Sequence, residues 1–310
     1  MDRPENNDGH PRGEIMSLQI TPSSDIRSAR SLISLLAGRL TQSASPRLDA
    51  SWLLGLSLGR DIAVQGHEDI CLDVDACARL GALMARRMKG EPVSRLRGKR
   101  EFWSHDFYLN EATLDPRADT ECLVAAACAF AALKPQGARP AQILDLGTGS
   151  GCILLSLLLE QPDAKGVGTD IAALAIAQAR ANAAMLGVAP RAAFHQTSWC
   201  DPIAGVFMPG LFDIITSNPP YIESQALLSA DVADYDPHHA LFAGADGLDD
   251  YRTLLPRLPA LMHRHSRAFI EIGSTQKDAV SALAIESGLA VCGIELDFSR
   301  RDRCLILTLE

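Results

Sequence analysis

The stretch Ile143–Leu158, ILDLGTGSGCILLSLL, decides the fold because it joins a short apolar run, a glycine-rich turn and a longer apolar run. The first run, Ile143–Leu146, is typical of a strand buried in a parallel sheet, and the second is long enough for a helix. Between them, Gly147, Gly149 and Gly151 alternate with small polar residues. Because glycine has no Cβ, a ligand can lie close against such a backbone. The stretch therefore predicts a strand, a ligand-binding turn and a helix.

From about residue 112 onward, further apolar runs alternate with helical patterns. The runs that we assign to strands are Val167–Asp170, Ala192–His195, Phe212–Thr216 and Ala268–Ile272. Such alternation predicts an α/β fold with a doubly wound, Rossmann-like and mostly parallel sheet. The final runs, VCGIELDF and RCLILTLE, are joined by a charged turn and predict an antiparallel pair at one edge.

The preceding part of the chain has a helical pattern and predicts a small separate domain. We expect three helices there: one that Ser24 and Asp25 cap and that runs to about Leu40, one from Pro46 to Gly59, and one from Asp73 to Gly90. The aromatic and β-branched residues that follow predict a β-hairpin. The expected organisation is a disordered tail over 1–23, a helical domain over 24–90, a hairpin linker over 91–112 and the α/β domain over 113–310.

The composition is that of an ordinary globular protein without a large surface for nucleic acid. Hydrophobic residues make up 47% of the 310 residues, and the formal net charge is -9, which disfavours extensive phosphate binding. The eight cysteines are dispersed without a C-x-x-C motif, so we expect reduced thiols and a cytoplasmic protein. Residues 1–16 lack the apolar core of a signal peptide, and no apolar run could span a bilayer. No histidine pair has a third ligand at metal-site spacing, so no metal is expected.

The glycine turn differs from the two common nucleotide motifs. A dinucleotide fingerprint needs a glycine where Cys152 lies, and no Lys-Ser or Lys-Thr follows the loop as it would in a P-loop. Asp145, before the loop, can accept from a cationic or amide group. Asp170, at the end of the next strand, is placed to bind two ribose hydroxyls. The expected ligand is a nucleoside that needs no phosphate cradle, and S-adenosylmethionine fits. A tight turn without a ligand is the alternative.

The sequence Asn218-Pro219-Pro220-Tyr221 ends the strand that begins at Phe212, since prolines cannot donate to a sheet. Asn218 offers a side-chain carbonyl and Pro219 a backbone carbonyl, and together these suit a planar –NH2 group. Tyr221 can lie against the flat face of that group. This arrangement predicts methyl transfer to nitrogen, in which proximity and orientation dominate. These residues do not separate glutamine, adenine and guanine targets, and a proline turn with an asparagine cap is the alternative.

From about Ser24 the chain resembles the HemK/PrmC family of protein-(glutamine-N5) methyltransferases. That family modifies the glutamine of the Gly-Gly-Gln motif in class I peptide-chain release factors. The matching segments, in chain order, are SPRLDASWLL, EPVSRLRGKREFW, DLGTGSG, SWCDP, NPPYI, DPHHALFAGADGLDDYR, FIEIGSTQ and LDFSRRDR. The hairpin segment and ALFAGADGL are specific to the family, whereas the glycine loop and NPPY occur in many methyltransferases.

The resemblance implies S-adenosylmethionine as the methyl donor, with S-adenosylhomocysteine as the product, and class I release factors as the protein substrate. It implies that the donor is bound by Gly147, Thr148, Gly149, Ser150, Gly151, Asp170, Trp199 and Asn218. It also implies that Asn218, Pro219 and Tyr221 are catalytic and that, with Pro220, they hold the glutamine amide. The helical domain would then recognise the substrate, and the domain over 113–310 would carry methyl transfer.

Two residues depart from the family pattern L-I-P-R-P-D-T-E, which begins here at Leu114. Asp115 replaces an apolar residue and Ala118 replaces a proline, while Arg117 and Asp119 are retained. The departures leave the stiffness of this substrate-side segment open.

Three other functions remain as alternatives to release factor methylation. A related enzyme could methylate a glutamine of a ribosomal protein, but the helical domain and the GKREFW segment favour a release factor. A nucleic-acid amine methyltransferase would need a basic target-binding region, which the net charge disfavours. A non-catalytic protein that binds the donor would have no need of the acceptor-side turn.

Overall fold

The computed structural model describes residues 23–133, 140–199, 201, 207 and 210–310. Contacts divide the chain into two compact units, unit 1 up to Leu96 and unit 2 from Arg97 to Glu310, and each is described by itself. The predicted disordered tail lies outside the described residues except for Ser23, which begins the first strand. Within the described ranges, no helix is long and apolar enough to cross a membrane.

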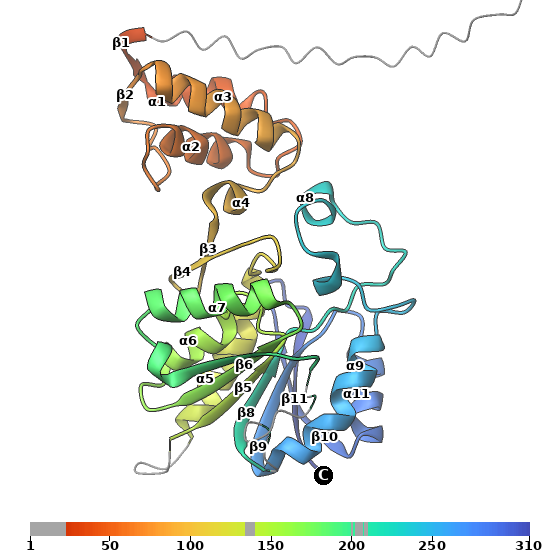
Figure 1. Ribbon diagram of the computed structural model, residues 1–310. Helices are drawn as coiled ribbons and strands as arrows, with labels where there is room; N and C mark the ends of the chain where they lie inside the picture. Colours follow the sequence, from red (N-terminus) through yellow and green to blue (C-terminus); the bar gives the residue numbers. More distant parts are fainter. Residues whose placement is uncertain (1–22, 134–139, 200, 202–206, 208–209) are drawn as a thin grey trace, which may run out of the picture. The chain divides into compact units, whose positions relative to one another are not determined.

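Unit 1 combines helices with a small sheet (Figure 1). Its elements are β1 (Ser23–Ser28), α1 (Ala29–Ala37), α2 (Pro46–Ser57), β2 (Asp69–Leu72) and α3 (Val74–Met88), with α4 (Val93–Arg97) at the boundary. The helices bury their apolar faces in one cluster that includes Leu36, Leu53 and Leu80. Asp73 caps α3, because its carboxylate accepts from the Ala76 N–H at 2.7 Å.

The prediction that Ser24 and Asp25 cap the first helix is wrong. These residues belong to β1, which pairs antiparallel with β2, and the helix begins only at Ala29. The two strands are separated in sequence by two helices, so no local pattern could indicate their pairing. The second and third helices end as expected, near Gly59 and Gly90, whose φ angles are 72° and 100°.

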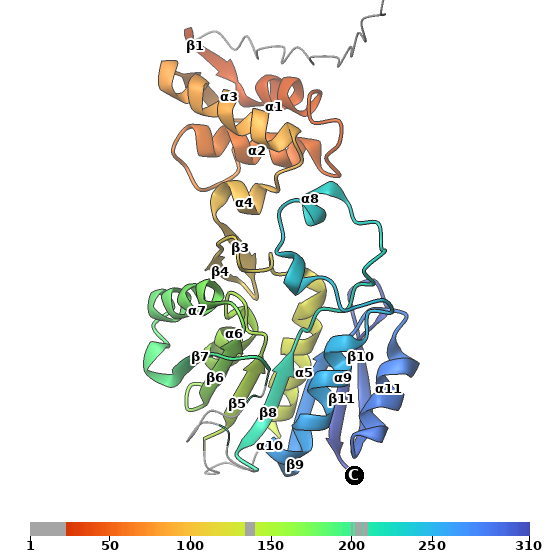
Figure 2. The ribbon, with the colours of Figure 1, turned by 45° about the vertical axis from the view of Figure 1, so that its right-hand side comes forward.

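Unit 2 is built on a seven-stranded sheet in the order β10-β11-β9-β8-β5-β6-β7 (Figure 1 and Figure 2). The strands are β5 (Gln142–Leu146), β6 (Lys165–Asp170), β7 (Ala192–Gln196), β8 (Phe212–Ser217), β9 (Met262–Glu271), β10 (Leu289–Leu296) and β11 (Asp302–Leu309). Strands β5 to β9 run parallel, and β11 pairs antiparallel with both β9 and β10. The predicted doubly wound, mostly parallel sheet with an antiparallel edge pair is confirmed.

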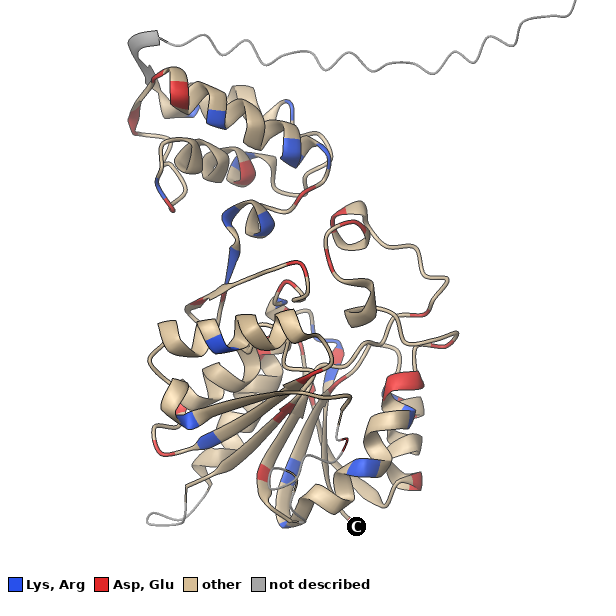
Figure 3. Cartoon of the chain, viewed as in Figure 1, with Lys and Arg blue, Asp and Glu red and all other residues tan. Residues whose placement is uncertain are grey.

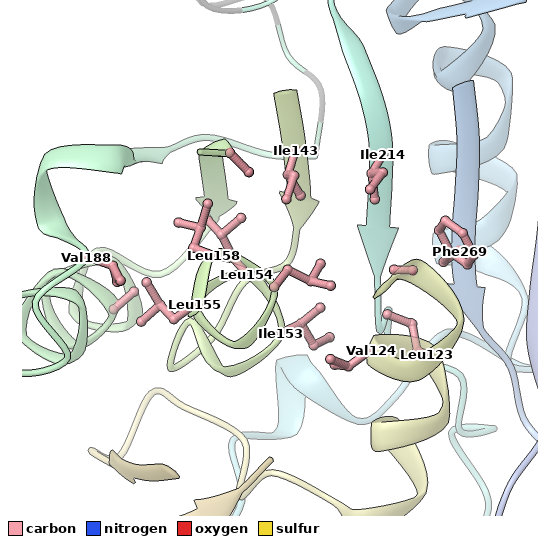
Figure 4. Close-up of a cluster of buried hydrophobic side chains, with 14 of the residues drawn as sticks. Leu123, Val124, Ile143, Ile153, Leu154, Leu155, Leu158, Val188, Ile214 and Phe269 are labelled. Atoms are coloured by element: carbon pink, nitrogen blue, oxygen red, sulfur yellow. The ribbon is translucent and has the colours of Figure 1, made fainter. Parts of the chain in front are cut away.

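Helices cover both faces of this sheet (Figure 2). One layer holds α5 (Glu121–Ala132), α6 (Cys152–Glu160) and α7 (Ala173–Met185), and the other holds α9 (Asp249–Leu254), α10 (Leu258–Leu261) and α11 (Lys277–Glu286). Successive strand residues point to opposite layers. Thus Ile143 packs in the cluster shown in Figure 4, whereas Leu144 packs in the other.

Short helical elements lie in the connections between these strands and helices. They are the helix α8 (Ala230–Ala233) and the 3₁₀ helices η1 (Ala118–Thr120), η2 (Ala189–Arg191), η3 (His238–Ala240) and η4 (Leu255–Arg257). The predicted hairpin is present as β3 (Lys99–Phe102) and β4 (His105–Tyr108). Its buried rings, Phe102 and Phe107, meet edge to face with centroids 6.2 Å apart. They belong to the same apolar cluster as Leu123 of α5, so the hairpin is part of unit 2 rather than a free linker.

One buried side chain, Asn182 in α7, joins the hairpin to the glycine loop. Its Oδ1 accepts from the Tyr108 N–H at 3.0 Å, and its Nδ2 donates to the carbonyls of Tyr108 and Ser150 at 3.0 and 2.8 Å. Asn182 is fully buried. Since unpaired polar groups are costly in a protein interior, this side chain stabilises both segments.

A second buried polar group, the Asp145 carboxylate, joins β5 to the glycine loop and to β8. It accepts from the hydroxyls of Thr148 at 2.6 Å and Thr216 at 2.7 Å. Asp145 therefore accepts from two hydroxyls of the fold itself, rather than from the cationic or amide group that we expected from the sequence. Burial raises the pKa of Asp145 to about 6, although both hydrogen bonds favour the carboxylate.

Replacing Asn182 by Ala should lower the free energy of unfolding by about 2–4 kcal/mol, because a fully buried side chain is removed and the backbone groups of Tyr108 and Ser150 lose their partners. Denaturant unfolding followed by circular dichroism measures this change. The matched control is Gln225→Ala, which removes an exposed amide. A loss no larger than the control's would show that these hydrogen bonds do not stabilise the fold.

Replacing Asp145 by Asn should change how stability depends on pH. The raised pKa means that the folded chain holds the proton more tightly, so the stability contribution of Asp145 is lost as pH rises from about 4 to about 6. The variant lacks this titration. The unfolding free energy of the variant minus that of the wild type should therefore increase by up to about 3 kcal/mol across that window, so the variant is favoured at higher pH. Urea unfolding at several pH values tests this, and a constant difference would contradict it.

Candidate active site

A cavity opens at the edge of the sheet where β5, β6 and β8 end, which is where doubly wound folds bind ligands. Several segments of unit 2 contribute to it. The residues that line it are Ala112, Leu114, Pro116, Arg117, Thr120, Gly147, Thr148, Gly149, Ser150, Cys152, Ile153, Asp170, Ile171, Thr197, Ser198, Trp199, Asn218, Pro220, His239, Ala240 and Asp250. This cavity is the candidate active site.

The glycine loop needs its glycines for conformation and for space. Gly147, Gly149 and Gly151 have φ angles of 71°, 55° and 83°, in the left-handed region that other residues rarely adopt. A Cβ on Gly151 would also lie 3.0 Å from the Leu155 Cδ1 atom. The first four loop residues line the cavity, whereas Gly151 is the N-cap of α6. The loop thus presents backbone, without bulky side chains, to a ligand.

Asp170 lies at the end of β6 and lines the cavity, as its sequence position indicated. Its two carboxylate oxygens accept from the backbone N–H groups of Gly149 and Ala172, both at 2.9 Å. Burial raises the pKa of Asp170, and these backbone hydrogen bonds oppose the increase. The carboxylate is therefore held in one orientation, and each oxygen keeps a lone pair for a ligand hydroxyl.

Trp199 also lines the cavity, and its backbone is in an unusual conformation. Its φ angle is 45°, which is rare for a bulky residue. A Cβ on Gly147 would lie 3.4 Å from the indole ring, so the ring lies close against the start of the glycine loop. Asp250 lines the same cavity, and burial raises the pKa of its carboxyl while the Trp199 side chain opposes the increase. The indole is thus a fixed wall of the cavity.

The NPPY turn contributes two of its four residues to the cavity lining, Asn218 and Pro220. The Asn218 Nδ2 atom donates to the Thr120 Oγ1 atom at 3.2 Å. Pro219 is buried, and neither it nor Tyr221 is among the lining residues. The Tyr221 hydroxyl donates instead to the Glu271 carboxylate at 3.4 Å, and burial raises the pKa of this tyrosine. The structure therefore brings Asn218, but not the Tyr221 ring, to the cavity.

Glu271, at the end of β9, is a buried acid that sequence reasoning missed. It is 1% exposed, and burial raises its pKa to about 7. The Thr120 hydroxyl, the charge of Arg303 and the Tyr221 hydroxyl oppose this increase in pKa. The FIEIG segment marked Glu271 only as part of an apolar strand, and nothing local showed that its side chain would face the NPPY turn.

Two loops that border the cavity are tied together by Asp236. Its carboxylate pairs with the Arg117 guanidinium and accepts from the Asp115 N–H at 3.2 Å. Asp115, one of the two departures from the family pattern, is buried, and its carboxylate lies 3.8 Å from the Arg100 guanidinium. The other departure, Ala118, is exposed and begins η1, so it leaves no gap in the core.

Other lining residues were not singled out from the sequence. Thr120, His239 and Asp250 come from three separate elements, η1, η3 and α9, and only tertiary folding brings them together. Every described cysteine is a free thiol. Among the described residues, no cluster of three or more His, Cys, Asp or Glu side chains could hold a metal ion.

Two protein-family models match this chain. Residues 31–98 match the PrmC N-terminal domain, and residues 139–243 match a methyltransferase domain. Among solved structures, the ribosomal protein L11 methylase from Lactobacillus delbrueckii subsp. bulgaricus is similar over 64% of this chain and 83% of its own, with 20% identity and a TM-score of 0.44.

Relatives named release factor glutamine methyltransferase align with most of the chain. The Rhodospirillum rubrum protein is 45% identical over 84% of this chain and 77% of its own length. The Bradyrhizobium diazoefficiens protein is 41% identical over 83% of this chain and 86% of its own, and the Yersinia pestis protein is 38% identical over 87% and 95%. With such identity over such coverage, the chain belongs to the family of release factor glutamine methyltransferases.

Proposed function

We propose that this chain transfers a methyl group from S-adenosylmethionine to the side-chain amide nitrogen of a glutamine in a release factor. The observation that carries the proposal is the convergence of the glycine loop, Asp170 and Asn218 on one cavity. Three adjacent parallel strands deliver these groups to a single edge. A donor pocket and an amide-binding asparagine are what methyl transfer to an amide needs.

The residues of the cavity fit the methyl donor. The glycine loop leaves backbone space that a Cβ would fill, the Asp170 carboxylate can accept from both ribose hydroxyls, and the Trp199 indole offers a flat surface for adenine. When bound, S-adenosylmethionine supplies an electrophilic methyl group. The chain's own residues hold the donor and exclude water from it.

On the acceptor side, the NPPY turn orients the amide. The carbonyl oxygens of Asn218 and Pro219 accept from the two N–H bonds of the glutamine side chain, and Tyr221 holds the far end of the turn through its hydrogen bond to Glu271. The nitrogen can lose its proton late, so orientation contributes more than a strong base. No carboxylate needs to remove that proton first.

We further assign the target to the Gly-Gly-Gln motif of class I release factors. A short loop offers few contacts, so recognition must draw on surface remote from the chemistry. Unit 1, which contains all but the last two residues of the match to the PrmC N-terminal domain, supplies such a surface. Its role is to recognise the release factor.

A nucleic-acid target fits less well. Figure 3 shows Lys and Arg concentrated along α4 and the start of β3. In that segment, Lys99 pairs with Asp106 at 2.5 Å and Arg100 lies 3.8 Å from Asp115. Acids thus offset these cations, which makes the segment a weak surface for phosphates.

Replacing Asp170 by Ala should weaken donor binding about ten- to a hundredfold, because charge-assisted hydrogen bonds of about 1.5–3 kcal/mol are lost. Calorimetry with S-adenosylmethionine or S-adenosylhomocysteine measures the affinity. Asp163→Ala, which removes an exposed acid beyond α6, is the control. A folded Asp170 variant that binds with unchanged affinity would remove this residue from the site.

Replacing Asn218 by Ala should nearly abolish methylation of a purified release factor, while donor affinity changes less than in the Asp170 variant. The reason is that Asn218 mainly orients the amide. Single-turnover reactions with labelled donor measure the chemical step, and peptide mapping locates the label. Activity within about threefold of wild type would contradict the orientation role.

The same assay tests the substrate. With wild-type enzyme, the label should map to the Gly-Gly-Gln glutamine and vanish when that glutamine is replaced. A parallel reaction with ribosomal proteins and with RNA separates the alternatives. Label found only on either of those would overturn the assignment.

A further inference from the structure

The carboxylate of the methyl donor has no partner among the groups assigned above. S-adenosylmethionine carries an amino-acid tail on its sulfur, and this tail ends in a carboxylate and an ammonium group. Asp170 accounts for the ribose, Trp199 for the adenine and Asn218 for the methyl end. A carboxylate that leaves water for a cavity needs a positive partner or several hydrogen-bond donors. The cavity therefore has to supply one more group.

Arg117 is the cation of the cavity lining. Among the described lining residues, the charged side chains are Arg117, Asp170 and Asp250, and His239 is a further titratable group. The two acids repel a carboxylate. A guanidinium is permanently charged, and its planar N–H groups match a carboxylate in two parallel hydrogen bonds. Arg117 is thus the lining residue whose chemistry fits the end of the tail.

Hydrogen bonds around η1 place Arg117 near the methyl end of the donor site. The Thr120 N–H donates to the Arg117 carbonyl at 3.1 Å, and the Thr120 hydroxyl accepts from the Asn218 Nδ2 atom at 3.2 Å. The tail and the methyl group are bonded to the same sulfur, so the tail begins beside Asn218. Because Asp170 holds the ribose, the tail extends away from Asp170 and toward the segment that contains Arg117.

Asp236 holds the Arg117 guanidinium without occupying all of its donors. The Arg117 Nη2 atom pairs with the Asp236 Oδ2 atom, and the Asp236 side chain is 3% exposed. The other oxygen of Asp236 accepts from the Asp115 N–H at 3.2 Å, so the acid is itself fixed. Within the described part of the chain, the guanidinium has no other acceptor, and the Arg117 side chain is 38% exposed. Its remaining N–H groups can therefore donate to a ligand.

We propose that Arg117 binds the carboxylate of S-adenosylmethionine and that Asp236 positions its guanidinium for this contact. The inference rests on the proposed function, because it takes S-adenosylmethionine as the donor. Recognition of the donor then has a charged group at each end, the Asp170 carboxylate at the ribose and the Arg117 guanidinium at the tail. A ligand that lacks the carboxylate gains nothing from Arg117.

The test is calorimetry of full-length enzyme with S-adenosylmethionine and with decarboxylated S-adenosylmethionine, which differ only in the carboxylate. Arg117→Met keeps an apolar stem but removes the guanidinium. It should weaken binding of S-adenosylmethionine roughly ten- to a hundredfold and change the affinity for the decarboxylated ligand by less than about threefold. Arg117→Lys keeps the charge without the planar fork and should recover part of the loss. The matched control is Arg60→Met, which removes a guanidinium paired with Glu68 in unit 1 and should leave both affinities unchanged.

Two further variants separate this contact from the support that Arg117 gives to the loops. Removing Arg117 leaves the buried Asp236 without its cation, which costs stability. Arg117→Met combined with Asp236→Asn removes that charge, and the new amide can still accept from the Asp115 N–H. The double variant should show the same difference between the two ligands. Asp236→Asn alone keeps the guanidinium, so it should weaken binding of S-adenosylmethionine less than Arg117→Met does.

The comparison of ligands decides between the possible results. Equal losses for the two ligands in Arg117→Met and in the double variant would overturn the assignment, because a purely supporting role affects both alike. Unchanged affinity for S-adenosylmethionine with a raised KM for the release factor would also overturn it and assign Arg117 to the protein substrate. Wild-type enzyme that binds neither ligand overturns the proposed function and this inference together. Wild-type enzyme that prefers S-adenosylmethionine to the same degree as Arg117→Met overturns this inference alone.

Discussion

The parallel pairing of β5 with β6 on one side and β8 on the other is the constraint on which the site depends. Parallel strands end at the same edge, so the glycine loop, Asp170 and Asn218 meet without any of them being close in sequence. The Asp145 carboxylate stabilises this edge, since it accepts hydrogen bonds from a hydroxyl of the loop and from one of β8. The relative positions of the glycine loop, Asp170 and Asn218 are therefore set by the register of β5, β6 and β8.

The sequence predicted the local features of the fold and site, but not the features that depend on tertiary contacts. The glycine spacing predicted the loop because its backbone angles exclude other residues, and Asp170 followed from strand order. The start of the first helix was mistaken because β1 is stabilised by a distant strand. Thr120 and Glu271 could not be found, because each lies in a segment whose own pattern shows only a helix start or a buried strand.

The departures from the family pattern have a structural setting. Asp115 is buried near the Arg100 guanidinium and shares Asp236 with Arg117, so the acid is part of an ion-pair network rather than a flaw in an apolar core. Breaking such a network by removing one charge costs more than the network itself contributes. The segment that borders the acceptor side is thus tied by charges as well as by packing.

Asn182 also limits which parts of this enzyme can be exchanged between relatives. The hairpin depends on a side chain of α7, and that side chain also holds the glycine loop. A chimera that takes the hairpin from one protein and the sheet from another would separate partners that have to match. A boundary between Leu96 and Arg97 keeps these partners in one unit. We therefore expect functional chimeras to be joined at this boundary, with the hairpin taken from the same protein as the sheet.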